Sequence, residues 1–467
     1  MFAAILLFLY ICPTLQGILD SEDPTCTSSL ECTNQKLPAL LTAARVLLPP
    51  PKSDQELGTT MILWTGANSS IPQVIDITNP SAVNGTDFDP KKNTTIISHG
   101  YLGDGYLEWI QEMCRALQTK ESINCFAINW GKGAGINYLQ SVSNIPAVGT
   151  QVANFIKFLI AEFGISFSNF IMIGHSLGAH LVGHVGMKCN SLLRMICGMD
   201  PASYLFIGAA DKDKLDRSDA KVVVIIHTDI ATIINNLALH GFGTTDLNAH
   251  IDIIVNGGRD QPGCPKSPLV LLTNLKDFAD TTGCSHQRVR YYLIASILYL
   301  NISAFTAYPA SSVKDFNNGT GFPCNNNCIQ VGDFNGLQEM VAKKPEHQLY
   351  FLNTGKDYPY YTYRCKTTLQ ISANSSTTAS LSMTLQKDSN QSEAYDLYSG
   401  DIPINSTSKY LDLSFDGPLK GATISYTSNT KIPVLITLTV VYGHNGAVYT
   451  LRNKEPSQDA TIKLDPK

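Results

Sequence analysis

FIMIGHSLGAHLVGHVG, the stretch from Phe170 to Gly186, contains the pattern on which the fold depends. Phe170–Ile173 is a short apolar run with the length of a buried strand, and apolar residues at helical spacing follow from Leu177. Between them lies Gly174-His175-Ser176-Leu177-Gly178, a Gly-x-Ser-x-Gly pentapeptide. A strand that turns sharply into a helix needs glycines beside the turn, because side chains there would clash. The pattern therefore predicts a strand–turn–helix unit that exposes the Ser176 hydroxyl at a sheet edge.

Strand-like and helical patterns alternate on both sides of this unit. Short apolar runs that predict strands occupy residues 61–65, 94–98, 124–130, 195–199 and 222–228. Helical periodicity covers residues 107–117 and 148–163. This alternation predicts an α/β domain with a mostly parallel sheet and helices on both faces. From about residue 361, many short β-type runs separated by Ser, Thr, Asn and Gly predict an all-β sandwich instead.

Length, charge and the N-terminal segment restrict the class of protein. A chain of 467 residues predicts more than one domain, here residues 18–360 and 361–467. The net charge is -5 and Lys and Arg form no dense cluster, which argues against nucleic acid as a partner. Residues 1–17 open with an apolar run too short to span a bilayer, so we predict a secretory signal peptide rather than a buried helix. No other stretch has the length and apolarity of a transmembrane helix.

Cysteine and asparagine patterns also indicate export. Twelve cysteines occur, and no Cys-x-x-Cys or His-rich spacing supports a zinc site. Ten of them form close pairs that suit local disulfides in an oxidising compartment: Cys26 with Cys32, Cys114 with Cys125, Cys189 with Cys197, Cys264 with Cys284, and Cys324 with Cys328. Cys12 belongs to the predicted signal peptide, and Cys365 has no predicted partner. Sequons for N-glycosylation occur at Asn68, Asn84, Asn93, Asn301, Asn318, Asn374, Asn390 and Asn405.

Asp200 is the predicted acid of a catalytic site built on Ser176. A serine hydroxyl is a poor nucleophile until a base takes its proton, and the base is usually a histidine oriented by a carboxylate. When a Gly-x-Ser-x-Gly serine works in this way, the chain order is Ser, then Asp, then His. Asp200 is the first acid downstream that ends a predicted strand, at the same sheet edge as Ser176. The alternative is a turn-forming Asp-Pro pair with Pro201.

His286 is the predicted base, because it lies in a loop beside Cys284 and before a long helical run. His227, His240 and His250 compete for this role on the sequence alone, since a lone histidine is more often structural than catalytic.

An oxyanion in this site needs two amide donors. The N–H of Leu177 opens the helix after the serine and is the first donor. Tyr101 follows the predicted strand at 94–98 and is the second, while the nearby His99 is expected to be structural. His180 and His184 have a spacing that could suit a metal, but they lie on the helix after the nucleophile, so we expect them to be structural as well.

Several motifs resemble the pancreatic-type animal lipase family in order and approximate spacing: GHSLGAH (174–180), GMDPAS (198–203), KLDRSDA (214–220), IIHTD (225–229), NGG followed by PGC (256–264), and Cys-x-His (284–286). The resemblance implies an α/β-hydrolase fold and hydrolysis of lipid esters by Ser176, Asp200 and His286. It also implies Tyr101 and Leu177 as oxyanion donors. The C-terminal region looks like the PLAT/C2-like domain of that family.

The resemblance also implies a structural calcium site. Its ligands would be the side chains of Asp216 and Asp219 and the carbonyls of Asp211 and Lys214, because calcium prefers carboxylate and carbonyl oxygens. Without the resemblance, a solvated charged loop that carries its own lysines would be the simpler interpretation.

The residues between Cys264 and Cys284 match the surface lid of that family. Apolar side chains recur there at i, i+4 and i+7, which predicts an amphipathic helix: Leu271, Leu275 and Phe278. A lid of this kind could cover the pocket in water and turn onto a lipid surface. A second loop, Gly241–Ala249, is expected to line the entrance.

The function that these features predict is a secreted lipase acting on triacylglycerols at a lipid–water interface. A phospholipase A1 or galactolipase is the alternative enzyme. A lipid-binding protein without catalysis, like the yolk-protein relatives of the family, is the alternative from another class. The C-terminal domain is expected to orient the enzyme on lipid or to bind a colipase-like protein.

Overall fold

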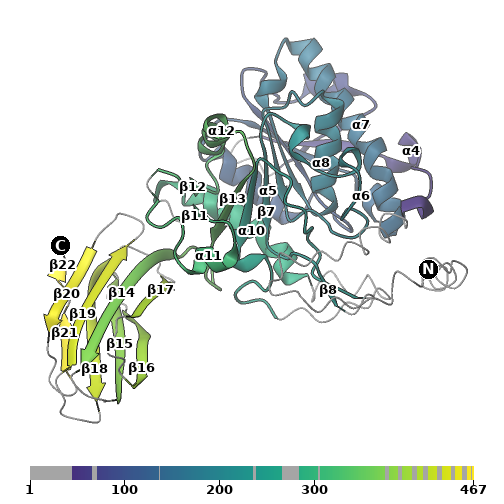
Figure 1. The fold of residues 1–467 in the computed structure, drawn as a ribbon. Coiled ribbons are helices and arrows are strands. Elements are labelled where there is room, and N and C mark those ends of the chain that lie inside the picture. The colour runs from purple at the N-terminus through teal and green to yellow at the C-terminus, as the bar shows by residue number, and fades with distance from the viewer. Residues whose placement is uncertain are drawn as a thin grey trace, which may run out of the picture. The chain divides into compact units, whose positions relative to one another are not determined.

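The computed structural model describes two compact units of the chain (Figure 1). One contains residues up to Leu298 together with Gly332–Leu349, and the other contains Tyr299–Val331 and Tyr350–Lys467. The described residues are 45–65, 71–135, 137–234, 238–265, 283–302, 305–324, 326–373, 378–387, 392–401, 407–413, 419–428, 434–442, 448–454, 460–463 and 465–466. The predicted signal peptide and the predicted lid helix lie outside them. Within these ranges, no helix has both the length and the apolarity to span a bilayer.

The first unit is built on a sheet whose strands run in the order β10-β7-β6-β5-β3-β4-β1-β2. Neighbours from β10 to β4 are parallel, and β1 is antiparallel to both β4 and β2. The central strands are buried along their whole length, as in sheets covered on both faces. The strands are β1 (Thr60–Trp64), β2 (Gln73–Asp76), β3 (Thr94–Ser98), β4 (Asn124–Asn129), β5 (Phe170–His175), β6 (Met195–Met199), β7 (Val223–His227) and β10 (Ile251–Val255), and a separate hairpin joins β8 (Thr232–Ile234) to β9 (Ala238–His240).

Strand register places three loops at one edge of this sheet. Ser98 at the end of β3 is level with Gly174 in β5, and His175 is level with Met199 at the end of β6. Parallel strands bring their carboxyl ends to the same edge, which is where ligands bind in such sheets. The loops that follow β3, β5 and β6 therefore meet there.

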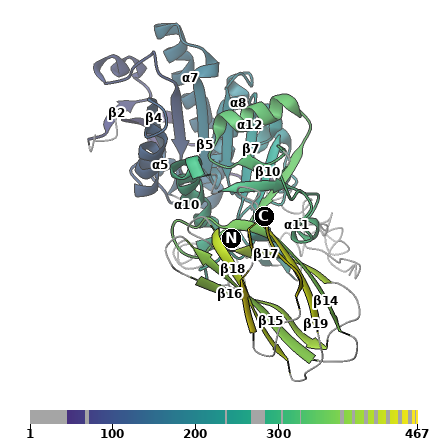
Figure 2. The same cartoon turned by 90° about the vertical axis from the view of Figure 1, so that its left-hand side faces the viewer.

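Helices cover both faces of the sheet. Helix α7 packs on α8 and helix α5 packs on α10. Figure 2 shows α5 and α10 on one side of β5 and α8 on the other. The helices of this unit are α4 (Asp54–Leu57), α5 (Glu108–Gln118), α6 (Gly131–Ala134), α7 (Tyr138–Phe163), α8 (Leu177–Lys188), α10 (Cys284–Leu298) and α12 (Phe334–Lys343).

Helix α7 begins at Tyr138, well before the start predicted at Val148. The side chain of Asn137 accepts a hydrogen bond from the Gln140 amide at 2.8 Å and caps the first turn. Pro146 then lies inside the helix, where proline usually interrupts the hydrogen-bond ladder. Because proline usually ends a helix, the sequence pattern did not indicate the ten residues of helix before Val148.

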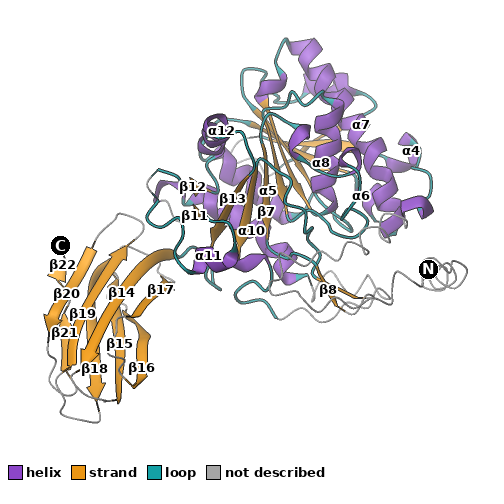
Figure 3. Ribbon diagram, viewed as in Figure 1, coloured by secondary structure: helices purple, strands orange, loops and turns teal. Residues whose placement is uncertain are grey.

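The second unit contains two antiparallel sheets, drawn in orange in Figure 3, with orders β17-β14-β19-β20-β22 and β16-β15-β18-β21. Their strands are β14 (Tyr363–Ala373), β15 (Thr378–Lys387), β16 (Ser392–Asp401), β17 (Thr407–Leu413), β18 (Leu419–Ser428), β19 (Val434–Tyr442), β20 (Val448–Lys454), β21 (Ala460–Lys463) and β22 (Asp465–Pro466). The unit also includes β11 (Thr306–Pro309), β12 (Ile329–Gln330) and α11 (Val313–Asn317), while β13 (Gln348–Leu352) spans the boundary between the units. Strand β16 was not predicted, because its sequence SEAYDLYSGD has no continuous apolar run.

Three of the predicted cysteine pairs form disulfides in the structure: Cys114–Cys125, Cys264–Cys284 and Cys324–Cys328. The first ties α5 to β4, and the second fixes the start of α10.

The predicted disulfide between Cys26 and Cys32 is not confirmed by the structure. Both Cys26 and Cys32 lie outside the described residues, which begin at residue 45. The pairing of Cys32 with Cys26 therefore stays a prediction from their spacing in the sequence.

The prediction of a Cys189–Cys197 disulfide is wrong, because both are free buried thiols. Cys189 ends α8 and Cys197 lies within β6. Burial raises the pKa of each thiol to about 12, so the thiolate that disulfide formation requires is disfavoured. Proximity in sequence was therefore a poor guide for two cysteines that belong to the core.

Candidate active site

Ser176 occupies a strained turn between β5 and α8. Its φ is 58° and its ψ is -123°, a conformation that is costly for a residue with a side chain. A Cβ on Gly174 would lie 2.3 Å from the Gly178 carbonyl oxygen, and one on Gly178 would lie 2.4 Å from the His99 carbonyl oxygen. Only glycine fits at these two positions, so the turn depends on both of them.

His286 and Asp200 form a buried hydrogen-bonded pair. The Nδ1 of His286 lies 2.6 Å from Oδ2 of Asp200, whose side chain is fully buried. The other carboxylate oxygen accepts hydrogen bonds from the amides of Thr228, at 2.8 Å, and Asp229, at 3.1 Å. A carboxylate held in this way keeps the proton on Nδ1 of His286 and leaves Nε2 as the basic atom.

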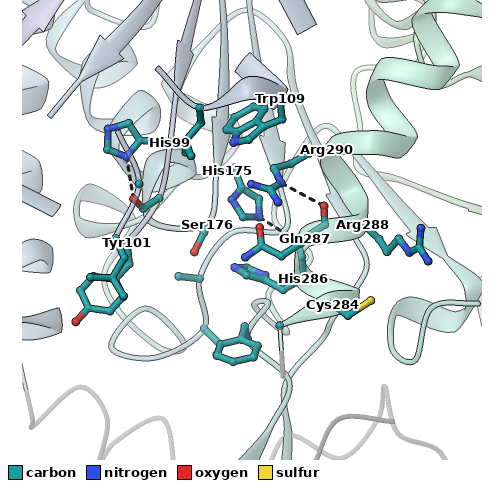
Figure 4. Close-up of a pocket in the computed structure, with 18 of the residues that line it drawn as sticks. His99, Tyr101, Trp109, His175, Ser176, Cys284, His286, Gln287, Arg288 and Arg290 are labelled. Carbon is teal, nitrogen blue, oxygen red and sulfur yellow. Dashed lines mark hydrogen bonds between the residues drawn. The ribbon is translucent and has the colours of Figure 1, made fainter. Parts of the chain in front are cut away.

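Ser176 and His286 line the same pocket, and Figure 4 shows them side by side. The structure therefore brings together all three residues that the sequence analysis selected for catalysis. They come from the turn after β5, the end of β6 and the first turn of α10.

The two predicted oxyanion donors lie on backbone segments that adjoin Ser176. A Cβ on Gly100 would lie 2.7 Å from the Cβ of Ser176, so the main chain that leads to Tyr101 passes directly beside the serine. Leu177 is the first residue of α8, where backbone N–H groups have no partner within the helix. This arrangement suits stabilisation of a negative oxygen next to Ser176.

His175 holds the backbone of the catalytic histidine, a role that the sequence did not predict. Its Nε2 donates a hydrogen bond to the His286 carbonyl oxygen at 3.0 Å. Burial, with the nearby positive charge of Arg290, lowers the pKa of His175 well below its usual value, so the ring is neutral. The ring of Phe242 also stacks on His286, with centroids 5.4 Å apart. The predicted loop Gly241–Ala249 thus reaches the site through Phe242.

Asp229 is a second carboxyl group beside Asp200 that sequence reasoning did not place in the site. Oxygens of both carboxyl groups and a nitrogen of His286 lie within 4.8 Å of one another. Burial and the charge of Asp200 raise the pKa of Asp229 well above its usual value. Its Oδ2 accepts a hydrogen bond from the Phe242 amide at 3.0 Å. Its position just after β7, at the same sheet edge, is the feature from which Asp229 could have been predicted to lie in the site.

The histidines that competed with His286 lie elsewhere or outside the described side chains. The Nε2 of His227 bonds to Asp252 at 2.7 Å, and both side chains are fully buried. The Nδ1 of His250 accepts a hydrogen bond from the Val223 amide at 3.0 Å. The side chain of His240 is not among those described.

His99 and His180 have structural hydrogen bonds, in agreement with the prediction. The Nδ1 of His99 bonds to the Gly100 carbonyl at 2.9 Å, and the Nε2 of His180 bonds to the Ala202 carbonyl at 2.9 Å. In the part of the chain that the structure describes, His180 and His184 belong to no group of residues that could hold a metal ion.

The pocket has a volume of about 630 Å³. Three aromatic rings form part of its wall: Tyr101 meets Tyr138 edge-on at 5.3 Å, and Tyr138 contacts Tyr204 at 5.5 Å. An apolar wall beside the nucleophile suits the acyl chain of an ester.

The predicted calcium ligands lie in one loop, in which the side chains of Asp216 and Asp219 are buried. Burial, with the charges of Asp216 and Asp211, raises the pKa of Asp219 to about 8. The charge of Lys214 is paired with a different carboxylate, since its Nζ lies 2.6 Å from Asp246. Two buried carboxylates in one loop are oxygen donors of the kind that calcium prefers, so the chemistry of these residues suits the ion.

The parallel sheet, the serine turn and the His–Asp pair together define the α/β-hydrolase class. A family model described as Lipase matches residues 23–360, and the chain belongs to this family.

Curated relatives match nearly the whole chain. Inactive pancreatic lipase-related protein 1 from Homo sapiens is 31% identical over 473 residues, which cover 98% of this chain and 98% of the relative. Pancreatic triacylglycerol lipase from Sus scrofa is 32% identical over 458 residues, 94% of this chain and 99% of the relative. Because one of these relatives is named inactive, catalysis by this chain has to be argued from its own residues.

Proposed function

We propose that the protein hydrolyses carboxylic esters of lipids, triacylglycerol among them, through an acyl-enzyme on Ser176. The observation that carries this proposal is the 2.6 Å hydrogen bond between His286 and Asp200, in the same pocket as the serine. A chain with this pair and a strained nucleophile turn retains the parts that catalysis needs.

The reaction follows from this geometry. The Nε2 of His286 takes the proton of the Ser176 hydroxyl as the serine oxygen attacks the ester carbonyl. The amides of Tyr101 and Leu177 stabilise the oxygen that becomes negative, and Asp200 stabilises the charged imidazole. His286 then gives its proton to the departing alcohol, and an acyl group remains on Ser176. Water activated by His286 releases the fatty acid.

The experiment that tests this function is initial rate against substrate concentration, with triolein and with phosphatidylcholine, and with the Ser176→Ala protein as the blank. A rate that rises sharply above the solubility limit of triolein would support a triacylglycerol lipase that acts at an interface. Faster turnover of phosphatidylcholine would favour the phospholipase A1 alternative. Equal rates for the blank and the natural protein on both lipids would favour a lipid-binding protein without catalysis.

We also propose that Asp216, Asp219 and the carbonyls of Asp211 and Lys214 hold a structural calcium ion. The ion would offset the repulsion between the two buried carboxylates. We expect excess EDTA to lower the melting temperature by roughly 5 °C or more, because loss of a tightly bound ion removes a few kcal/mol of stability. The initial rate at 25 °C should fall less.

Thermal melts in EDTA and in a calcium titration measure this effect. The Asp219→Asn protein should respond weakly to calcium, and Asp357→Asn, at an exposed carboxylate that pairs with the neighbouring Lys356, serves as the control. A melting temperature of the natural protein that calcium leaves unchanged would remove the calcium proposal.

Secretion, glycosylation and a lipid-orienting role of the C-terminal sheets complete the proposal. The paired antiparallel sheets of β14–β22 support a PLAT-like sandwich. We propose that this domain holds the enzyme at a lipid surface, with a colipase-like protein as a further candidate partner.

A further inference from the structure

The wall of the active-site pocket is positively charged. Among its described lining residues are two arginines, Arg288 and Arg290, and no aspartate or glutamate. In Figure 4, Arg290 and Trp109 lie on one side of Ser176 and Tyr101 lies on the other. The pocket therefore has an aromatic wall and a cationic wall, with the nucleophile between them.

Arg290 is a partly buried cation whose described neighbours carry no opposite charge. Its Nε donates to the Gln287 carbonyl at 3.3 Å, and its guanidinium carbon lies 5.3 Å from the centroid of the Trp109 ring. Burial lowers its pKa to about 10, so the group is still charged at neutral pH. Within the described part of the chain, no carboxylate forms an ion pair with Arg290. Cation–π contacts with Trp109 and with Tyr291, whose ring centroid lies 5.7 Å away, offset part of the cost of burying this charge, and an anionic ligand would offset more of it.

Trp109 adds a second unused donor to the same wall. Its side chain is only 4% exposed, and its indole Nε1 has no hydrogen-bond partner among the described residues. An indole N–H and a guanidinium can only donate hydrogen bonds. The two groups together suit a ligand oxygen that only accepts hydrogen bonds, and the positive charge of Arg290 favours an anionic one.

His175 connects this wall to the catalytic His286. The Trp109 ring contacts the ring of His175 with centroids 6.1 Å apart, and His175 bonds to the backbone of His286. An anion held here would share the pocket of Ser176 with the ester under attack. A triacylglycerol carries no charge, whereas a glycerophospholipid carries a phosphate a few bonds from its acyl esters.

We propose that Arg290 and Trp109 form an anion site that takes the phosphate of a glycerophospholipid whose acyl ester lies at Ser176. This inference rests on the proposed function and specifies its substrates. The enzyme should then hydrolyse triacylglycerol but favour a lipid that carries an anionic phosphate.

The test uses short-chain lipids below their aggregation limit, so that the charge of a lipid surface plays no part. The ratio of kcat/KM for dihexanoylphosphatidate to kcat/KM for tributyrin is measured for the natural protein and for three variants. We expect Arg290→Gln to lower this ratio about tenfold or more, and Arg290→Lys to restore part of it, because a lysine keeps the charge but not the forked geometry. Arg115→Gln removes an exposed arginine of the same helix as Trp109 and should leave the ratio as it is. An equal ratio for Arg290→Gln and the natural protein would overturn the proposal.

Binding to the Ser176→Ala protein separates this inference from the proposed function, because it needs no turnover. Calorimetry with dihexanoylphosphatidate should show an affinity that falls about tenfold or more when Arg290→Gln is added. Affinity that does not depend on Arg290 would refute the anion site even if the enzyme is active. Hexanoate binding more tightly than the phosphatidate would assign the site to a fatty acid product and also overturn the proposal. Loss of Ser176-dependent turnover alone would refute only the proposed function.

Discussion

Ser176→Ala should reduce the hydrolysis of triolein by about 10⁵-fold or more, since removal of a serine nucleophile leaves only the oxyanion donors and substrate binding. The physical reason is that no acyl-enzyme can form without the hydroxyl. The substitution removes one oxygen from a side chain that is only 9% exposed, and the smaller alanine fits the space. Far-ultraviolet circular dichroism and the melting temperature should therefore match those of the natural protein.

The measurement is fatty acid release at constant pH under conditions in which the natural protein gives a linear rate. Ser203→Ala is the matched control, because Ser203 lines the same pocket and is also buried, yet is not assigned a role in the reaction. It should retain activity to within about tenfold. A Ser176→Ala protein that is folded and still active would disprove the assignment of the nucleophile.

Local patterns selected residues that the structure brings together, because each of them ends a strand or begins a helix. The turn at Ser176 follows from two glycines whose missing side chains make room for neighbouring backbone. Asp200 could be placed because it directly follows β6, and register then brings it level with the serine turn. His286 needed the family resemblance, because its sequence context alone did not separate it from His227 or His250.

What the sequence did not predict depends on contacts between distant segments. Asp229 lies near Asp200 because β7 is next to β6 in the sheet. Local periodicity predicts strands but not their order. Arg290 and Trp109 belong to α10 and α5, which pack together although they are far apart in the chain. The free thiols of Cys189 and Cys197 could not be predicted for the same reason: they are close in sequence, but both are buried in the core and form no disulfide.

Asp200→Asn should lower kcat by about 10⁴-fold with little change in substrate binding, because it places the proton of His286 on the wrong nitrogen. Oδ1 of Asp200 accepts hydrogen bonds from the amides of Thr228 and Asp229, so the carbonyl oxygen of an asparagine must take that position. The NH₂ group of the asparagine then faces Nδ1 of His286. Since NH₂ only donates, Nδ1 must accept, and the ring proton moves to Nε2. A protonated Nε2 cannot take the proton of Ser176.

Asp229→Asn is the matched control for this prediction, because it makes the same chemical change to the neighbouring carboxyl group. Burial and the charge of Asp200 raise the pKa of Asp229 well above its usual value, which favours the neutral form that an asparagine resembles. An asparagine carbonyl can still accept the hydrogen bond from the Phe242 amide that Oδ2 accepts. We therefore expect kcat to change by less than about tenfold. Steady-state kinetics on tributyrin for both variants decide the matter: a larger loss from Asp229→Asn than from Asp200→Asn would make Asp229 the acid that orients His286.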